Sequence, residues 1–419
     1  MTEVKALIIT IGDELLIGQV IDTNSAWIAQ QLNQIGIAIV ERRSVGDSRE
    51  QILAVLKEAE TIAPIVLITG GLGPTADDIT KPVMCEYFGG SMVLHEPTLA
   101  HVTRIFEEIL KKPMIERNRQ QAMVPSSCTV LMNEKGTAPG MMFEKGKSIY
   151  ISMPGVPTEM KWIMQQHVLP MLPQKFELGS FLHKTLLTAG IGESFLAEEI
   201  QTVETALPVN CKLAYLPNYG MVRLRLSVYD KNHEAAEAVL NEWFNKLKAA
   251  VLPYLVADED IPIHIALTRL LQSKNATVST AESCTGGYIA HLLTSQPGSS
   301  ASFKGSIVAY DNEVKHSELG VSFEVLQEHG AVSQPVVEQM AKAVRAKMKT
   351  DYSIAVSGIM GPNGGTDEKP VGTVWMAVAS ESRCMSKKVQ LRYNRQLNIE
   401  ATANQAIHML QRLIVDNPS

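Results

Sequence analysis

Aromatic side chains are scarce in this sequence, where they make up 5% of 419 residues. So few rings leave little material for the stacking platforms on which single-stranded nucleic acids bind. Basic side chains are not in excess either, because the formal net charge is −6 and the pI is about 6.0. The chain therefore lacks the overall basic character of a nucleic-acid-binding protein, and we expect no nucleic-acid partner.

Cysteine pairs and long apolar runs are also missing. The five cysteines show no CxxC spacing, which predicts reduced thiols rather than a zinc site or a disulfide framework. No apolar run reaches the roughly 18 residues of a membrane-spanning helix. The N-terminus shows neither the charged lead nor the apolar region of a signal peptide. We therefore expect a cytoplasmic protein with no membrane partner.

What the sequence does contain is an alternation of buried strands and amphipathic helices. Apolar runs at residues 4–11, 37–40 and 65–69 are separated by helical patterns, one of them capped by Asp22-Thr23-Asn24. Continuous apolar runs are typical of strands covered on both faces, so this part is predicted to be an α/β domain with a mostly parallel sheet. Ligands of such sheets bind at the carboxyl ends of the strands.

Two polar loops follow strands of this domain. Gly12-Asp13-Glu14 follows the first strand, and residues 69–78, with three glycines and then two aspartates, follow the third. Glycines leave backbone N–H groups accessible to phosphate, and carboxylates on phosphate-facing loops commonly hold magnesium. Asp13, Asp77 and Asp78 are therefore candidate metal ligands. A glycine turn with acidic residues favoured by a helix dipole is the alternative.

Further loops lie at residues 136–140 and 154–160, and a helical run at residues 118–124 carries Gln121. Together these motifs resemble the N-terminal domain of the CinA (competence/damage-inducible) family, which has a molybdopterin-binding-protein-like fold. The resemblance covers residues 1–172 and implies metal-dependent hydrolysis of the pyrophosphate of ADP-ribose. The substrate contacts expected with it are Gly70, Gly71, Gly73, Thr75 and Gly140, and the metal ligands are Asp13, Asp77 and Asp78, with magnesium as the metal.

Residues 173–258 are predicted to form a small α+β domain, which is KH-like in the same family. Residues 170–180 indicate a linker before it, and residues 212–216 and 221–229 indicate a β-hairpin. A KH domain that clamps RNA needs a Gly-x-x-Gly loop, which this segment lacks. We therefore expect a connecting or dimerisation element and a homodimer. The glycine-bearing helix start at residues 190–194 is an alternative ligand contact.

The last part, residues 259–419, repeats the α/β pattern and holds three candidate nucleophiles in one turn. The stretch Thr280-Ala281-Glu282-Ser283-Cys284-Thr285-Gly286-Gly287 lies between a strand-like run and an amphipathic helix. A helix start offers free N–H groups to an oxyanion or a phosphate. An N-cap serine in a glycine turn is the alternative. Cys284 is the rival nucleophile, because a helix start favours a thiolate.

No histidine of this domain lies in a polar loop at a strand end, so a Ser-His-Asp triad is not favoured. A lysine can accept the proton instead if burial lowers its pKa. Lys315 is the candidate, with Tyr310 close to it in the chain. Spacing alone favours the plainer explanation, which is a solvated lysine and an ordinary loop tyrosine.

The whole domain is similar to the nicotinamide-nucleotide amidase domain of the CinA family, which converts nicotinamide mononucleotide to nicotinate mononucleotide and ammonia. The resemblance implies Ser283, Tyr310 and Lys315 as catalytic residues. The implied substrate contacts are Thr285, Gly286, Gly287, Ser357, Gly358, Gly361 and Arg395. Ser357 replaces a threonine of the family pattern and keeps its hydroxyl, and Tyr393 replaces a glycine. Two further residues depart from the pattern. Met360 replaces an alanine and is expected to narrow the pocket, and Asn394 replaces an aspartate beside Arg395.

The sequence therefore predicts a bifunctional hydrolase of pyridine-nucleotide salvage that acts on small-molecule nucleotides. A divalent metal is expected in the N-terminal domain and no cofactor in the amidase domain. The alternative is a molybdopterin-handling or competence-related regulatory binding protein, which rests on the fold resemblance of the first domain.

Overall fold

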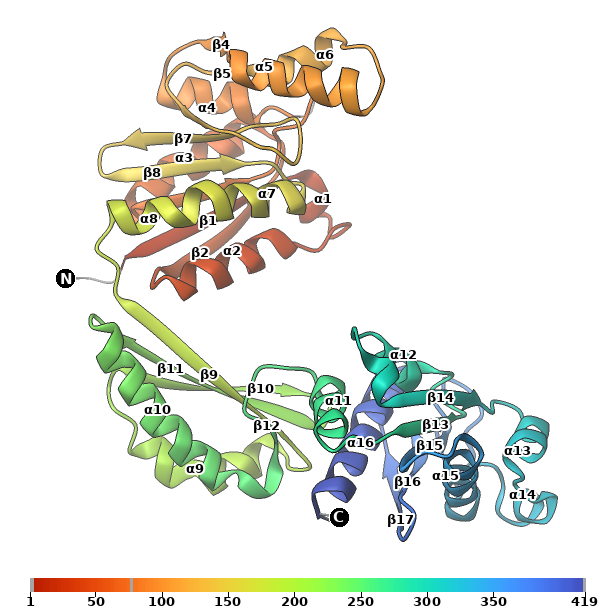
Figure 1. The fold of residues 1–419 in the computed structure, drawn as a ribbon. Helices are drawn as coiled ribbons and strands as arrows, with labels where there is room; N and C mark the ends of the chain where they lie inside the picture. Colours follow the sequence, from red (N-terminus) through yellow and green to blue (C-terminus); the bar gives the residue numbers. More distant parts are fainter. Residues whose placement is uncertain (1–3, 76–77, 417–419) are drawn as a thin grey trace. The chain divides into compact units, whose positions relative to one another are not determined.

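The computed structural model describes residues 4–75 and 78–416. It confirms the predicted order of an α/β domain, a small α+β domain and a second α/β domain (Figure 1). The chain divides into two compact units, residues 1–182 with 228–239 and residues 183–227 with 240–419. Within the described ranges, no helix is both long enough and apolar enough to cross a membrane.

The N-terminal domain is built on a six-stranded sheet. Its strands are β1 (Lys5–Ile11), β2 (Ala38–Val45), β3 (Ile65–Thr69), β6 (Thr129–Leu131), β7 (Gly140–Lys145) and β8 (Ser148–Met153), in the order β2-β1-β3-β8-β7-β6. Strands β2, β1, β3 and β8 are parallel, whereas β7 is antiparallel to both of its neighbours. Because the chain continues from β1 to β2 on one side and crosses to β3 on the other, a crevice is expected where β1 and β3 end.

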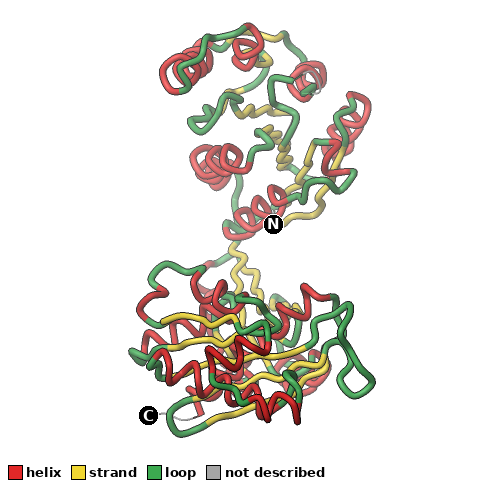
Figure 2. The backbone as a smooth tube through the Cα atoms, turned by 90° about the vertical axis from the view of Figure 1, so that its right-hand side faces the viewer, coloured by secondary structure: helices red, strands yellow, loops and turns green. Residues whose placement is uncertain are grey.

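Helices cover both faces of this sheet (Figures 1 and 2). Helices α2 (Thr23–Gln34), α7 (Pro157–Ile163) and α8 (Leu169–Lys175) pack on one face, and α3 (Arg49–Ile62) and α4 (Thr80–Phe88) on the other. The short α1 (Asp13–Leu16) follows β1, and α5 (Glu96–Thr103) and α6 (Glu116–Arg119) lie with a separate ribbon that pairs β4 (Met92–Leu94) with β5 (Met123–Pro125) (Figure 1). The pleat of β1 sends Leu7 and Ile9 to the side of α3 and α4, and Ile8 to the side of α2, α7 and α8. Both faces being covered explains the continuous apolar runs.

The predicted linker at residues 170–180 is wrong in its first half, because α8 runs through Lys175. Pro170 lies just after the π-helical segment Met164–Val168, an irregularity of the kind at which helices accommodate a missing N–H. Leu172 is fully buried in the core of the domain. Burial of that side chain holds the helix in place despite its prolines.

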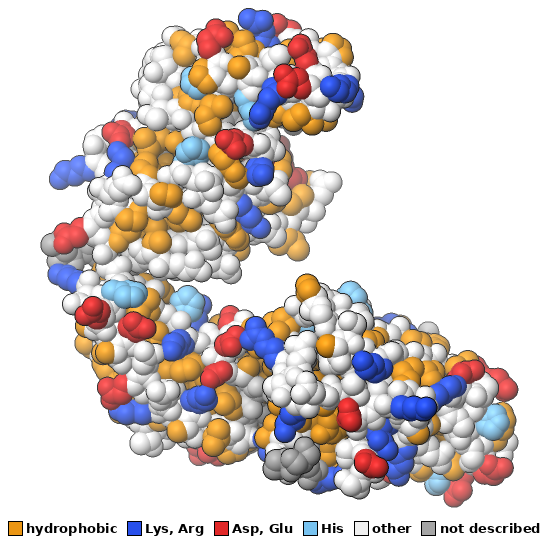
Figure 3. Space-filling model, viewed as in Figure 1, with side chains coloured by type: hydrophobic (Ala, Val, Ile, Leu, Met, Phe, Trp, Pro, Cys, Tyr) orange, Lys and Arg blue, Asp and Glu red, His pale blue; other side chains and the backbone are white. Residues whose placement is uncertain are grey.

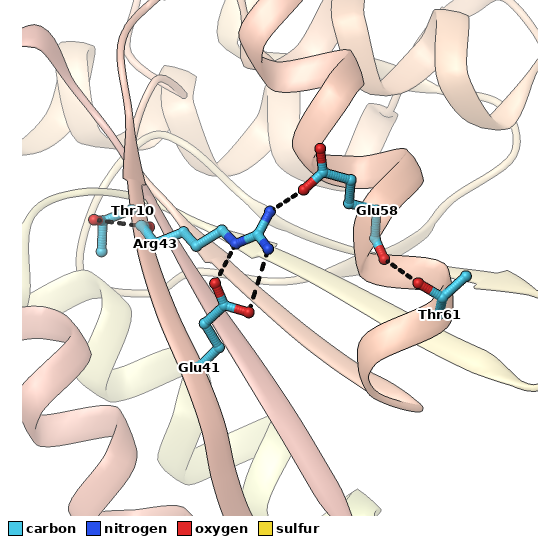
Figure 4. Close-up of polar contacts among 5 residues, drawn as sticks. All are labelled: Thr10, Glu41, Arg43, Glu58 and Thr61. Carbon is cyan, nitrogen blue, oxygen red and sulfur yellow. Dashed lines mark hydrogen bonds and ion pairs between the residues drawn. The ribbon is translucent and has the colours of Figure 1, made fainter.

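An ion-pair cluster joins the edge strand β2 to helix α3 (Figure 4). Arg43 donates to Glu41, two residues earlier on the same face of β2, and to Glu58 on α3. Thr10 on β1 donates to the backbone carbonyl of Arg43 at 3.4 Å, and Thr61 donates to that of Glu58 at 2.9 Å. The pairs are partly exposed, so each contributes about 1 kcal/mol or less, and apolar packing of α3 dominates.

The middle domain contains β9 (Ser180–Ala189), α9 (Glu193–Thr205), β10 (Cys211–Asn218), β11 (Met221–Asp230), α10 (His233–Ala250) and β12 (Leu255–Ala257). Its sheet has the order β10-β11-β9-β12, which confirms the predicted hairpin. The turn between β10 and β11 uses Tyr219 and Gly220, with φ +40° and +85°, as two-residue hairpin turns require. On the visible face of each domain, acidic and basic side chains are interspersed (Figure 3).

The C-terminal domain has a five-stranded sheet with the order β14-β13-β15-β16-β17. Its elements are α11 (Ile263–Ser273), β13 (Val278–Glu282), α12 (Tyr288–Thr294), β14 (Phe303–Val308), α13 (Asn312–Leu319), α14 (Phe323–His329), α15 (Gln334–Met348), β15 (Tyr352–Gly358), β16 (Thr373–Ala379), β17 (Cys384–Gln390) and α16 (Arg395–Asp416). On β15, Ile354 and Val356 pack towards α11, α12 and α16, and Ala355 packs towards α15. The strands β14, β13 and β15 are parallel, so their carboxyl ends meet at one edge.

Candidate active sites

Polar residues follow the ends of the three parallel strands in the C-terminal sheet. Ser283 follows β13, Tyr310 follows β14 by two residues, and Ser357 is the last residue but one of β15. The chain passes from β14 on one side of β13 to β15 on the other, so this edge is the switch point of the sheet. The topology therefore brings residues that are far apart in sequence to the place where such sheets bind ligands.

The turn after β13 is organised by the carboxylate of Glu282, which is fully buried. It accepts hydrogen bonds from the hydroxyls of Thr280 (3.2 Å) and Thr285 (2.7 Å) and from the N–H groups of Gly287 (3.1 Å), Ile289 (3.0 Å) and Ala290 (2.8 Å). Glu282 therefore satisfies the free N–H groups of the α12 start. The Thr285 hydroxyl and the Gly287 N–H, predicted to contact substrate, both point to Glu282 instead. Gly286 and Gly287 supply the positive φ values, +60° and +97°, that the turn needs.

Two backbone N–H groups beside Ser283 donate to no other described residue. Ser283 is 8% exposed, its N–H donates to the Val356 carbonyl at 3.0 Å, and its hydroxyl bonds to no described residue. The N–H groups of Cys284 and Thr285 also find no acceptor in another described residue. A hydroxyl followed by two free N–H groups is an arrangement that can hold the oxyanion of an acyl-transfer intermediate.

Cys284, the rival nucleophile, is 5% exposed. Burial raises the pKa of its thiol to about 12, and the Glu282 carboxylate adds to the rise. The positive charges of Lys315 and Arg395 oppose that rise, so both lie near the same turn. A thiol with this pKa is protonated at neutral pH and is a poor nucleophile, which favours Ser283.

Lys315 on α13 is buried, with 1% of its surface exposed. Its ammonium donates to the backbone carbonyls of Ala309 (2.9 Å) and Tyr310 (3.0 Å). Desolvation lowers the pKa of Lys315, against the opposing effect of Asp311 and Cys284. The solvated lysine that spacing alone favoured is therefore wrong. A buried lysine with a lowered pKa can lose its proton and accept one from a hydroxyl.

Arg395, at the start of α16, links two other loops of the site. It donates to the Tyr310 hydroxyl oxygen at 2.9 Å and to the Gly361 carbonyl at 2.9 Å. Tyr310 is 60% exposed, so its ring lies at the surface of the site and its hydroxyl proton stays available. The structure thus brings Tyr310, Arg395 and the glycine-rich loop after β15 into direct contact.

Asn398, which the sequence did not single out, holds this arrangement together. It is fully buried, and its amide nitrogen donates to the carbonyls of Met360 (3.1 Å) and Tyr393 (3.0 Å). Asn394 caps α16 by accepting from the Leu397 N–H at 3.0 Å. An asparagine therefore positions the start of the helix that carries Arg395, although the family pattern has an aspartate there. For Asn398, the only available sequence signal was its position as a polar residue in the first turn of the helix.

Three expectations for the loop after β15 change. Met360 is 3% exposed and packs in the core, so it does not narrow the pocket. The Ser357 hydroxyl donates to the Ala331 carbonyl at 2.8 Å, so its proton is already used. Gly358 is required by strand packing, because a Cβ there would lie 2.8 Å from the Val374 side chain. Gly361 has φ +83° and offers its carbonyl to Arg395.

In the N-terminal domain, a cavity of about 470 Å³ lies at the carboxyl ends of β1 and β3. All four polar loops of the sequence analysis contribute to its walls. Among the residues that line it are Glu14, Asp22, Asn24, Gly70, Gly71, Gly73, Asp78, Gln121, Thr137 and Glu159. Gly70 is needed because a Cβ there would lie 2.0 Å from the Ile11 carbonyl. The glycines thus let the two strand ends approach each other.

The predicted metal ligands do not form a site among the described residues. Asp13 does not line the cavity. Its carboxylate accepts from the Asp47 N–H, and the Asp47 carboxylate accepts from the Asp13 N–H, both at 3.1 Å. Asp78 lines the cavity but accepts from the N–H groups of Gly73 (2.8 Å) and Thr75 (2.9 Å). Asp77 lies outside the described residues, and within them no group of three His, Cys, Asp or Glu side chains could hold a metal.

Two other predicted substrate contacts have local structural roles. Thr75 does not line the cavity, and its hydroxyl donates to Asp78. Gly140 also lies outside the cavity walls. A glycine there serves packing, because a Cβ would lie 3.2 Å from the side chains of Ile163 and Leu131. Glu159, which was not singled out, does line the cavity. Desolvation raises the pKa of Glu159, against a hydrogen bond from the Asn133 amide at 2.6 Å.

Comparison with known proteins agrees with this architecture. Three family models match: a probable molybdopterin binding domain at residues 7–174, a damage-inducible protein CinA KH domain at residues 183–257, and a CinA C-terminal domain at residues 261–414. A CinA-like protein of Flavobacterium psychrophilum is 45% identical over 99% of this chain and 100% of its own length. The chain belongs to the CinA family.

Other members of the CinA family are similar along nearly the whole chain as well. A CinA-like protein of Cytophaga hutchinsonii is 44% identical over 98% of each chain. Among solved structures, the competence damage-inducible protein A of Klebsiella pneumoniae is 32% identical, covers 37% of this chain and 98% of its own, and has a TM-score of 0.36. The protein CinA of Thermoplasma acidophilum is 29% identical, covers 41% and 98%, and has a TM-score of 0.37.

Proposed function

We propose that the C-terminal domain hydrolyses the amide of nicotinamide mononucleotide to nicotinate mononucleotide and ammonia. The observation that carries the proposal is that the turn after β13 holds Ser283 and two N–H groups that donate to no other described residue, while the charges of buried Lys315 and of Arg395 act on Cys284 in the same turn. Ser283 attacks the carboxamide carbon, and neutral Lys315 takes the hydroxyl proton. The N–H groups of Cys284 and Thr285 bind the oxyanion. Lys315 returns the proton to the leaving ammonia, and water then hydrolyses the acyl-serine.

Arg395 supplies the contact for the phosphate of the nucleotide. Its guanidinium is already oriented by Tyr310 and the Gly361 carbonyl, which lowers the entropy lost when it pairs with a phosphate. Tyr310 is proposed to hold the ligand or relay a proton at the open side of the site, since its side chain is largely exposed.

The decisive experiment is ammonia release from nicotinamide mononucleotide by matched neighbouring variants. Ser283→Ala is expected to lose at least about a thousandfold in kcat, as removal of a nucleophile does. Cys284→Ala is expected to stay within about threefold of wild type, because its thiol is protonated and buried. Loss in the cysteine variant with retention in the serine variant would reject the serine mechanism.

We infer further that the N-terminal domain cleaves ADP-ribose to AMP and ribose 5-phosphate. The cavity of about 470 Å³ has room for much of such a ligand. The N–H groups of Gly70 and Gly73 already donate to the Met153 carbonyl and to Asp78, so the Gly71 N–H, which donates to no other described residue, is the one available to a pyrophosphate. The requirement for a divalent metal stays a prediction. Because the described carboxylates do not gather into a metal site, we route no step through a metal.

This second activity is tested by AMP release from ADP-ribose with magnesium or with a chelator. The Ser283→Ala variant is the control, because its N-terminal cavity is unchanged. We expect full AMP release from that variant with magnesium and little with the chelator. AMP release that Ser283→Ala abolishes would contradict two separate sites.

A further inference from the structure

The N-terminal cavity contains a buried glutamine whose side chain bonds to no described residue. Gln121 lies in the short 3-10 turn Gln120–Ala122, is 3% exposed and lines the cavity. Its side-chain oxygen is buried and has no hydrogen-bond partner. Its backbone carbonyl accepts from the ammonium of Lys81 at 2.7 Å. The turn is thus fixed, while the amide at its end remains unpaired.

A second amide in the same cavity is half satisfied. The side-chain nitrogen of Asn24 donates to the Thr69 hydroxyl at 3.2 Å and to the Gly155 carbonyl at 2.7 Å. These two bonds fix the orientation of the amide. The Asn24 side-chain oxygen is then left buried without a donor, in the wall of the cavity.

Buried polar atoms without partners are rare, because each costs folding free energy, about 1–3 kcal/mol. Both of these oxygens belong to residues that line one cavity. A ligand in that cavity would satisfy both at once. The cost of leaving them unpaired in the free protein is then recovered on binding.

The chemistry of the two amides limits the kind of ligand. Gln121 offers a donor and an acceptor side by side, which matches a heterocycle edge with an adjacent acceptor and donor, as in adenine or a pterin. Asn24 offers only an acceptor, which matches a hydroxyl. The described cavity walls carry the carboxylates of Glu14, Asp22, Asp78 and Glu159 but no lysine or arginine. Side-chain charge therefore does not select for a phosphate there.

We propose that Gln121 binds the amino-bearing edge of the ligand's ring and that Asn24 accepts from a sugar hydroxyl of the same ligand. The proposal rests on the N-terminal function inferred above, since ADP-ribose carries both an adenine and ribose hydroxyls. It assigns the adenosine half of the ligand, rather than its phosphates, to these two side chains.

The test is calorimetric binding to the full chain, using AMP, which is not turned over. The ligand series adds purine riboside 5′-monophosphate, which lacks the amino group, the 2′- and 3′-deoxy forms of AMP, and pterin-6-carboxylate. The protein series compares Gln121→Met, an apolar side chain of similar length, with Gln120→Met at the exposed neighbour.

Wild type should bind AMP about tenfold more tightly than the purine analogue, because a bidentate amide contact is lost. Gln121→Met should lose about tenfold in AMP affinity and all of that preference, without a lower melting temperature, since it removes an unpaired buried group. Gln120→Met should match wild type. One of the two deoxy forms should bind wild type about tenfold more weakly.

Unchanged AMP affinity and preference in Gln121→Met would overturn the proposal and assign buried water to that amide. A parallel fall in affinity and melting temperature would also overturn it, in favour of a structural role. Equal binding of both deoxy forms would reject the role of Asn24. Gln121-dependent binding of pterin-6-carboxylate without AMP binding would support the ring-edge contact and reject ADP-ribose as substrate. Binding is measured without turnover, so a failure of hydrolysis is a separate result.

Discussion

The two α/β domains place their candidate sites at the same position in their sheets but equip them differently. Each site lies where parallel strands end at a switch point, and each loop is organised by a carboxylate that accepts backbone N–H groups. Asp78 does this for the glycine-rich loop after β3, and Glu282 for the turn after β13. Each domain also buries a lysine on a helix next to that loop, Lys81 and Lys315.

The difference lies in what each lysine faces. Lys81 donates to the Gln121 carbonyl outside the cavity walls, and burial lowers its pKa to about 8, against the nearby Asp78. Lys315 lies close to Cys284, the neighbour of the candidate nucleophile Ser283. The same topology thus supports one lysine that fixes the backbone of the cavity wall at Gln121 and another lysine positioned for proton transfer. Side chains at the strand ends, not the fold, decide the chemistry.

Replacing the two lysines in parallel is the strongest test of whether Lys81 and Lys315 have different roles. Lys315→Met should lower ammonia release from nicotinamide mononucleotide by about 10²- to 10⁴-fold, because it removes the proton acceptor. Lys81→Met should leave that activity at the wild-type level. Equal effects of the two substitutions would mean that Lys315 has only a packing role.

The pH profile sharpens the same point. A lysine acts as a base only when neutral, and the neutral form of Lys315 is lost as pH falls through its lowered pKa. The amidase rate should therefore rise with pH and level off below the ordinary lysine pKa near 10.4. Initial rates across pH 6 to 10 measure this. A rate that keeps rising up to pH 10 would argue against a lowered pKa at the base.

The two loop-organising carboxylates should differ in their cost to stability. Glu282→Gln should lower the free energy of unfolding by about 2–4 kcal/mol, because an amide nitrogen then faces buried N–H groups. Asp78→Asn should cost about 1 kcal/mol, since Asp78 is partly exposed. Urea unfolding of both variants provides the measurement. A larger cost at Asp78 would reverse the comparison.

The phosphate contact should appear in KM rather than in kcat. Arg395→Met should raise KM for nicotinamide mononucleotide roughly tenfold, because a charge-assisted contact is lost. Nicotinamide riboside, which has no phosphate, should be hydrolysed equally by both proteins. A matching loss with the riboside would show that Arg395 acts through Tyr310 instead.

The smallest effect is expected at His408, which lines a second cavity, of about 280 Å³, where α16 passes the β10–β11 turn. Burial, helped by Arg412 and Lys387, lowers its pKa to about 4. In the unfolded chain His408 therefore binds a proton near pH 6.5, whereas in the folded protein it binds one only near pH 4. The free energy of unfolding therefore falls as pH drops through that window. His408→Gln should flatten the melting-temperature profile between pH 4 and 7 by a few degrees. An unchanged slope would assign the pH dependence to other groups.

Much of the fold could be predicted from the sequence because buried parallel strands need continuous apolar runs, as at residues 65–69. The polar loops at their ends were equally visible, and the cavity wall contains part of each one predicted for the first domain. The errors arose where burial reverses a local signal. Pro170 and Pro173 suggested a linker, yet Leu172 is buried and the segment is helical. Met360 looked like a pocket residue and lies in the core.

The sequence by itself determined which residues could do chemistry and at which strand ends they lie, since hydrophobic periodicity sets the elements and the elements set the loops. Only the tertiary structure decided which polar atoms remain available. Packing around Cys284 raises the pKa of its thiol, and packing around Lys315 lowers the pKa of its ammonium. It also joins the Thr285 hydroxyl to Glu282 and leaves the Gln121 amide unpaired. Desolvation and hydrogen bonding depend on neighbours distant in the chain, which no local pattern specifies.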